Sequence, residues 1–138
     1  MGACAVGHES GSSNMSRAVP IVFVVDDDVS VRESLELLIR CEGWQPETFA
    51  SAQEFLVRPR VLAPSCMILD VGMPGMSGPE LQRELKLRGQ HIPIVFITAN
   101  RDEAIRPRVL AQGAVACLFK PFSDTALLDA LNKALQVN

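Results

Sequence analysis

The chain of 138 residues contains no long hydrophobic run and no cluster of basic residues. None of its apolar segments approaches the roughly 20 residues that a membrane-spanning helix needs, and its N-terminus lacks the apolar stretch of a secretion signal. The formal net charge is -3 at pH 7, so the chain has no electrostatic footprint for nucleic acid. We therefore expect a soluble, cytoplasmic protein that contacts neither membranes nor nucleic acid directly.

Cysteine and histidine are both scarce. The cysteines are Cys4, Cys41, Cys66 and Cys117. Because no two of them have C-x-x-C spacing, we expect four reduced thiols in a cytoplasmic protein. His8 and His91 have no metal-ligand partner nearby in the sequence, so both are interpreted as solvated histidines outside any site.

The first 18 residues differ in composition from the rest of the chain. Residues 1–18 are mostly small and polar and show no apolar periodicity, so we expect a flexible leader or an expression scar. Hydrophobic residues make up 48% of the whole chain, which is enough for the core of one domain. We expect residues 19–138 to form that domain.

Five short apolar runs alternate with helical patterns from Pro20 onward, as is typical of βαβ units and a parallel sheet. The expected strands are Ile21–Val25, Gln45–Phe49, Cys66–Leu69, Ile94–Thr98 and Val115–Phe119. A right-handed crossover at every step places helices on both faces of the sheet. The sequence therefore predicts a doubly wound α/β fold of three layers.

Capping residues and breakers mark two of the helices. Ser77 and Glu80 form a capping box that opens the third helix, and Gly89 should end it. Pro107 disfavours a helical conformation at Arg106, so the fourth helix should start late, near Arg106.

Charged and hydroxyl side chains stand where four of these strands end. Asp26 and Asp27 follow the first strand, and Asp70 follows the third. Thr98 closes the fourth strand and Lys120 follows the fifth. Because the carboxyl ends of parallel strands share one edge, these residues should converge on one pocket. Three carboxylates, a hydroxyl and an ammonium suit a divalent cation and a phosphoryl group.

The run of three aspartates also has a structural explanation, because an acidic residue before a helix often caps it. Asp28 is interpreted in this way. Asp26 and Asp27 instead crowd like charges at the sheet edge, which raises the pKa of a carboxyl unless a cation relieves the repulsion. Magnesium suits that need because it takes oxygen ligands and keeps several waters.

The other strand-end residues have equally ordinary explanations when each is taken alone. An aspartate such as Asp70 is common in turns, Thr98 suits a strand, and Lys120 could be a snorkelling lysine. Their shared edge favours the functional interpretation, in which Lys120 beside Asp70 is a compact counter-charge for phosphate.

Four motifs occur in order along the chain: Val-Val-Asp-Asp, Leu-Asp-Val-Gly-Met-Pro-Gly-Met-Ser-Gly, Ile-Thr-Ala-Asn and Phe-Lys-Pro-Phe. With these motifs the chain resembles the response-regulator receiver domains of two-component signalling, over residues 19–137. The Met-Pro-Gly-Met-Ser-Gly stretch is most similar to the nitrogen-fixation (FixJ) branch. The resemblance implies a flavodoxin-like, five-stranded parallel sheet of order 2-1-3-4-5.

The resemblance also assigns roles by position. It implies that Asp70 is the phosphoacceptor, and that Thr98 and Lys120 bind the phosphoryl oxygens. It implies that Mg²⁺ is held by Asp26, Asp27, Asp70 and the backbone carbonyl of Gly72. Cys117 departs from the family, because receivers usually carry there an aromatic ring that is coupled to the threonine. Gly72 has no side chain to orient an attacking water, so the lifetime of the phosphate stays open.

Partners follow from the same resemblance. It implies a sensor histidine kinase or a phosphotransfer protein as donor in a phosphorelay, and a conformational change in the fourth helix, the last strand and the last helix. A downstream protein target or a missing output domain would respond to that surface, through which a dimer could also form. Such a domain catalyses only its own phosphotransfer and dephosphorylation and is not otherwise an enzyme. Whether the chain is a natural stand-alone receiver or a truncated regulator stays open.

Two rival functions remain. A haloacid-dehalogenase-type phosphatase also uses a strand-end aspartate and magnesium, but Asp70-Val71-Gly72 lacks the second acid of its D-x-D pattern. A degenerate receiver would act as a phosphorylation-independent protein-binding module, an alternative motivated by Cys117 and Gly72. Phosphorylation by a small phosphodonor would separate a working receiver from both.

Overall fold

Five strands and five helices alternate in the computed structural model, which describes residues 19–59, 64–99 and 103–137. The strands are β1 (Ile21–Val25), β2 (Gln45–Phe49), β3 (Ser65–Asp70), β4 (Ile94–Thr98) and β5 (Ala116–Phe119). The helices are α1 (Val29–Cys41), α2 (Ala52–Leu56), α3 (Gly78–Leu87), α4 (Ile105–Ala111) and α5 (Asp124–Val137). The expected leader, residues 1–18, lies outside the described residues.

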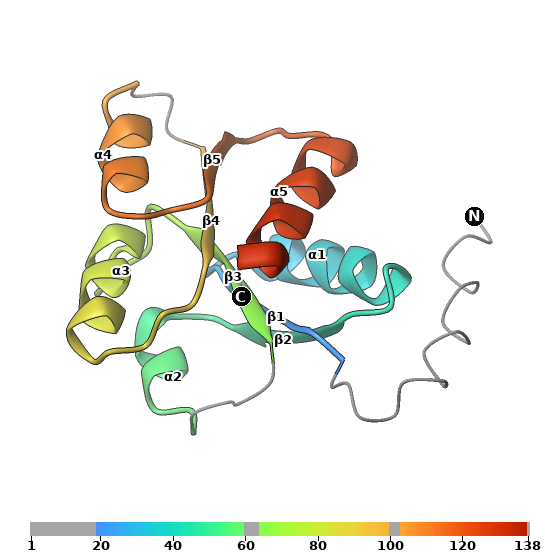
Figure 1. Ribbon diagram of the computed structural model, residues 1–138, viewed down its shortest axis with the longest axis horizontal. Helices are drawn as coiled ribbons and strands as arrows, with labels where there is room; N and C mark the ends of the chain where they lie inside the picture. Colours follow the sequence, from blue (N-terminus) through green and yellow to red (C-terminus); the bar gives the residue numbers. More distant parts are fainter. Residues whose placement is uncertain (1–18, 60–63, 100–102, 138) are drawn as a thin grey trace.

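The strands form one parallel sheet in the order β2-β1-β3-β4-β5, which confirms the predicted fold class and strand order. Helices α1 and α5 cover one face, and α2, α3 and α4 cover the other (Figure 1). The result is the expected three-layer α/β arrangement. It brings the carboxyl ends of β1, β3, β4 and β5 to one edge of the sheet.

The core explains why the central strands are apolar throughout rather than alternating. In β1, Val22 and Val24 pack against α1 and α5, whereas Phe23 and Val25 pack against the opposite helices. Both faces of a parallel sheet are covered, so each side chain of such a strand has an apolar partner. All five residues of β1 are buried.

Several element boundaries agree with the sequence signals. The capping box of α3 is present, since Ser77 Oγ accepts from the Glu80 N–H while a Glu80 carboxylate oxygen accepts from the Ser77 N–H. Gly89 follows α3 with a φ of 72°, a left-handed conformation that glycine adopts without strain. The predicted ends of this helix are therefore confirmed.

Other boundaries differ from the prediction by a residue. Strand β3 includes Asp70 as its last residue, and β5 begins at Ala116 rather than Val115. Helix α4 begins at Ile105, one residue before the predicted start near Arg106, so the late start of this helix is confirmed. Pro107 lies in the first turn of α4, where a backbone N–H has no partner within the helix, so the proline is tolerated.

The expectation of four reduced thiols is wrong for Cys41, which is disulfide-bonded. Cysteines without C-x-x-C spacing can still form disulfides, so the spacing alone did not establish a reduced thiol. Cys66 and Cys117 are free thiols and buried. Cys4 lies outside the described residues. In the described part of the chain, every helix is too short or too polar to cross a bilayer.

The start of α3 packs directly against the end of β3. Gly78, the first residue of α3, donates its N–H to the Val71 carbonyl oxygen over 3.0 Å. A Cβ atom placed on Gly78 would lie 2.3 Å from the Asp70 carbonyl oxygen and 3.0 Å from the Phe96 ring. Only a residue without a side chain fits here, and this close approach fixes the backbone of Asp70.

We predict that Gly78→Ala lowers the free energy of unfolding by about 2 kcal/mol or more, because the backbone must shift to relieve the overlap. Urea denaturation followed by circular dichroism measures the change. Gly72→Ala is the matched control, since a Cβ at Gly72 meets nothing within 4 Å. Equal denaturation midpoints for the two variants would contradict the close approach.

Candidate functional site

The strand-end residues meet at the carboxyl edge of the sheet. Carboxylate oxygens of Asp26, Asp27 and Asp70 all lie within 4.8 Å of one another. Lys120 Nζ lies 3.3 Å from Asp26 Oδ2 and 3.8 Å from Asp70 Oδ1. These four residues come from three segments of the chain that the parallel sheet places side by side. The set of three oxygen donors can hold a metal ion.

Asp26 is the most firmly held of the three carboxylates. It is fully buried, and its Oδ1 accepts a hydrogen bond of 2.9 Å from the Asp28 N–H. Its own N–H donates to the Phe49 carbonyl, while its carbonyl oxygen accepts from Arg32 Nη1 over 2.7 Å. Arg32 was not among the predicted site residues. Arg32 lies on α1, and its hydrogen bond to the Asp26 carbonyl oxygen holds the backbone from which Asp26 and Asp27 project.

The three consecutive aspartates have different roles, and the structure confirms the interpretation of Asp28 as a helix cap. Asp28 caps α1, because its side chain accepts a hydrogen bond of 2.9 Å from the Ser30 N–H. Asp27 is exposed to solvent and supplies the third carboxylate of the cluster. An exposed oxygen beside two buried ones leaves one side of the cluster open to water and to an incoming group.

Asp70 has an altered acidity. Burial raises its pKa from an ordinary 3.8 to about 6, and the charge of Asp26 adds to that increase. Lys120 and a hydrogen bond from the Gly72 N–H act in the opposite direction, and Asp27 raises the pKa slightly further. The carboxylate of Asp70 is thus ionised at neutral pH, in surroundings that favour its neutralisation by a proton, a cation or a covalent bond.

Thr98 closes the site from the neighbouring strand. It is the last residue of β4, it is buried, and it directly follows Ile97, the register partner of Asp70. The Lys120 N–H donates to the Thr98 carbonyl oxygen over 2.8 Å. The ends of β4 and β5 are therefore tied together at the two residues that were expected to bind phosphoryl oxygens.

Cys117 faces away from the acidic cluster, as strand alternation predicts. It packs in the same apolar cluster as Val109 of α4. Arg106 of α4 donates from Nε to the Cys117 carbonyl oxygen over 3.2 Å, and its guanidinium lies 4.5 Å from the centre of the Phe119 ring. Burial raises the pKa of the Cys117 thiol, and Arg106 opposes that increase. Arg106, which sequence reasoning missed, connects α4 to the strand that ends at Lys120.

Comparison with known proteins points to one family. Residues 22–132 match the family model described as the response regulator receiver domain. Nodulation protein W of Bradyrhizobium diazoefficiens is 43% identical over 130 residues, which cover 94% of this chain and 55% of that protein. Transcriptional regulatory protein FixJ of Azorhizobium caulinodans is 38% identical over 121 residues, covering 88% of this chain and 57% of that protein. The chain thus spans a little over half the length of these relatives.

A solved structure agrees with the sequence relatives. The structure of the response regulator StyR superposes with a TM-score of 0.82 at 50% sequence identity, covering 88% of this chain and 61% of that one. Half of the aligned residues are identical, so the two chains share sequence as well as fold. The similarity to the FixJ branch that the motifs suggested is confirmed by these findings.

The raised pKa of Asp70 predicts a pH dependence of stability in magnesium-free buffer. The neutral form is favoured in the folded state, so this stabilisation is fully present below about pH 4 and is lost as the pH rises through about 6. Relative to Asp70→Asn, the wild type should lose about 2 to 3 kcal/mol of unfolding free energy over that interval. Urea denaturation at both ends of the interval measures it. A difference that does not change with pH would contradict the elevated pKa.

Proposed function

The chain belongs to the response regulator receiver family, and we propose that it accepts a phosphoryl group on Asp70 from a sensor histidine kinase or a phosphotransfer protein. As a receiver domain it is a signalling module rather than a true enzyme. Its acidic pocket of Asp26, Asp27 and Asp70 is consistent with phosphoacceptor function. The observation that carries the proposal is the position of Lys120, whose Nζ lies 3.8 Å from Asp70 Oδ1 and 3.3 Å from Asp26 Oδ2.

The transfer needs positioning and charge neutralisation more than covalent assistance. A carboxylate oxygen of Asp70 forms a bond to phosphorus while the bond between phosphorus and the histidine nitrogen of the donor breaks. The electron pair of that bond stays on the imidazole, which takes up a proton from solvent. The product on Asp70 is an acyl phosphate.

The residues present fit a magnesium ion. Three clustered carboxylates and one ammonium leave a net charge of −2 when all are ionised, since −3 and +1 sum to −2. We propose that the ion would be held by Asp26, Asp27, Asp70 and the carbonyl oxygen of Gly72, because magnesium prefers oxygen ligands. When bound, it neutralises the charge that approaches with the phosphoryl group. Gly72 lies in the loop after β3 and is exposed, so its carbonyl can serve without a side chain in the way.

Lys120 and Thr98 then bind the phosphoryl oxygens in this proposal. Lys120 is only one quarter exposed and already lies between two carboxylates, so its ammonium can turn to an incoming anion with a small displacement. Thr98 is tied to the backbone of Lys120, so a hydroxyl drawn towards the phosphoryl group would carry the ends of β4 and β5 with it. Arg106 connects that segment to α4.

The output of the proposed reaction is a conformational change of the surface formed by α4, β5 and α5. A partner responds only if its affinity differs between the two states, so the phosphorylated form must present a different arrangement of this surface. We propose a downstream protein, an output domain or a second copy of the chain as the group that recognises it. The proposal concerns the receiver alone, because the matched segments cover only 55% and 57% of these relatives.

We predict that a small phosphodonor with Mg²⁺ adds one phosphoryl group to the wild type and none to Asp70→Asn, because an amide oxygen is not the required nucleophile. Intact-protein mass spectrometry measures the addition. Asp28→Asn is the matched control: it removes the same charge two residues from Asp26, and asparagine still caps α1.

Phosphorylation of Asp70→Asn to the wild-type level would refute the assignment of Asp70. A wild type that takes up no phosphoryl group would favour the phosphorylation-independent binding module instead.

We predict that Mg²⁺ raises the urea midpoint of the wild type, and that Asp27→Ala removes most of this effect because a ligand is lost. At a concentration roughly ten times Kd, the stabilisation should be about 1.4 kcal/mol. Asp28→Asn should retain the full shift. If Asp27→Ala responds to Mg²⁺ as the wild type does, the ion binds elsewhere.

A further inference from the structure

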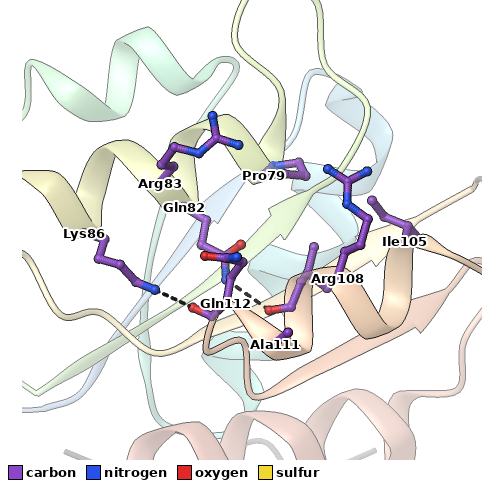
Figure 2. Close-up of a pocket in the computed structure, with 9 residues that line it drawn as sticks. Pro79, Gln82, Arg83, Lys86, Ile105, Arg108, Ala111 and Gln112 are labelled. Atoms are coloured by element: carbon purple, nitrogen blue, oxygen red, sulfur yellow. Dashed lines mark hydrogen bonds between the residues drawn. The ribbon is translucent and has the colours of Figure 1, made fainter.

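A cavity of about 220 Å³ lies between α3 and α4 (Figure 2), and no residue of the acidic cluster lines it. Helix α3 contributes Pro79, Gln82, Arg83 and Lys86 to its lining, and the α4 segment contributes Arg108 and Gln112. Two hydrogen bonds connect α3 to the α4 segment beside this cavity. Lys86 Nζ donates to the Gln112 carbonyl oxygen over 3.0 Å, and Gln82 Nε2 donates to the Val109 carbonyl oxygen over 3.3 Å.

The charge of this cavity is one-sided. Three basic side chains line it and no carboxylate does. Among the described residues, Arg83, Lys86 and Arg108 form no salt bridge, although each of Arg40, Arg58 and Arg88 pairs with a glutamate. All three basic side chains are exposed, so an anion that enters the cavity from solvent can reach positive charge on both helices.

The cavity also holds hydrogen-bond donors that the protein does not use up. Gln82 is 94% buried. Its side-chain amide has two N–H groups, of which one donates to the Val109 carbonyl oxygen and the other can donate to a ligand. The ammonium of Lys86 has three N–H groups, of which one donates to the Gln112 carbonyl oxygen. The guanidinium groups of Arg83 and Arg108 lie on either side of Pro79 (Figure 2), and a guanidinium can hold a carboxylate through two parallel hydrogen bonds.

The walls limit the kind of anion. Ile105 and Ala111 add aliphatic surface between the basic groups, so part of the ligand should be apolar. The volume suits a small organic molecule and is below the range of typical cofactor pockets, which begin at about 300 Å³. We propose that the groove between α3 and α4 binds a small organic dianion, with two carboxylates held by basic groups of the two helices and a short aliphatic part between them.

The test uses the unphosphorylated chain, so its result does not depend on the role of Asp70. Succinate is titrated into the ¹⁵N-labelled protein in magnesium-free buffer at constant ionic strength, and amide chemical shifts report where it binds. We expect saturable shifts confined to α3, α4 and the residues that follow α4. Acetate, which has one carboxylate, should bind at least about tenfold more weakly, because one charge-assisted pair is lost.

Variants separate the groove from general attraction to positive charge. Arg83→Gln and Arg108→Gln should each weaken succinate binding about tenfold, since each removes a bidentate partner. Arg88→Gln is the matched control: it lies just past the end of α3, carries the same charge change, pairs with Glu84 and does not line the cavity. It should bind succinate within about twofold of the wild type, as exposed charges contribute little at a distance.

Three results would overturn the proposal. One is the absence of saturable shifts in α3 and α4. Another is equal affinity of Arg88→Gln and Arg108→Gln, which would indicate nonspecific attraction. The third is inorganic phosphate binding in the groove as tightly as succinate, because the aliphatic walls would then play no part in selecting the ligand.

Discussion

Repulsion among three carboxylates is the interaction on which this structure depends. Asp26, Asp27 and Asp70 bring their oxygens within 4.8 Å of one another at the end of a buried sheet, where water cannot fully screen the charges. Such an arrangement is unfavourable in isolation, and the fold offsets it with one ammonium and a few backbone donors. Lys120 provides the ammonium, and the N–H groups of Asp28 and Gly72 provide donors. These groups do not fully compensate the repulsion among the carboxylates, so a bound cation would stabilise the pocket further.

The sheet supplies the rigidity that this arrangement needs. Each acidic residue ends or follows a strand that is buried on both faces, so none of these backbone segments can move apart to reduce the repulsion. Gly78 adds a second restraint by packing against the Asp70 carbonyl oxygen. Because the carboxylates cannot move apart, their repulsion persists in the folded state, and a bound cation that neutralises the cluster relieves it.

The sequence was most informative where structure depends on local pattern. Parallel strands end at one edge, so the meeting of Asp26, Asp70 and Lys120 could be predicted from their places after apolar runs. The capping box at Ser77 was readable for the same reason, because its two hydrogen bonds span only three residues.

What sequence reasoning missed depends on how helices lie against the sheet. Arg106 reaches β5 from α4 over a separation of 11 residues, and its spacing carries no signal for that contact. The groove between α3 and α4 likewise combines side chains from helices that only their packing brings together.

The unequal attachment of α3 and α4 has a mechanical consequence. Helix α3 begins with a capping box and a backbone contact at Asp70, whereas α4 has seven residues and no side-chain hydrogen bond at its N-cap. These two helices follow strands β3 and β4 in the chain, so their unequal attachment should make them respond differently to a force at the acidic cluster. Under the proposed phosphorylation of Asp70, α3 would serve as the fixed reference and α4 would be the helix displaced, so the direction of the response would be set before any partner binds.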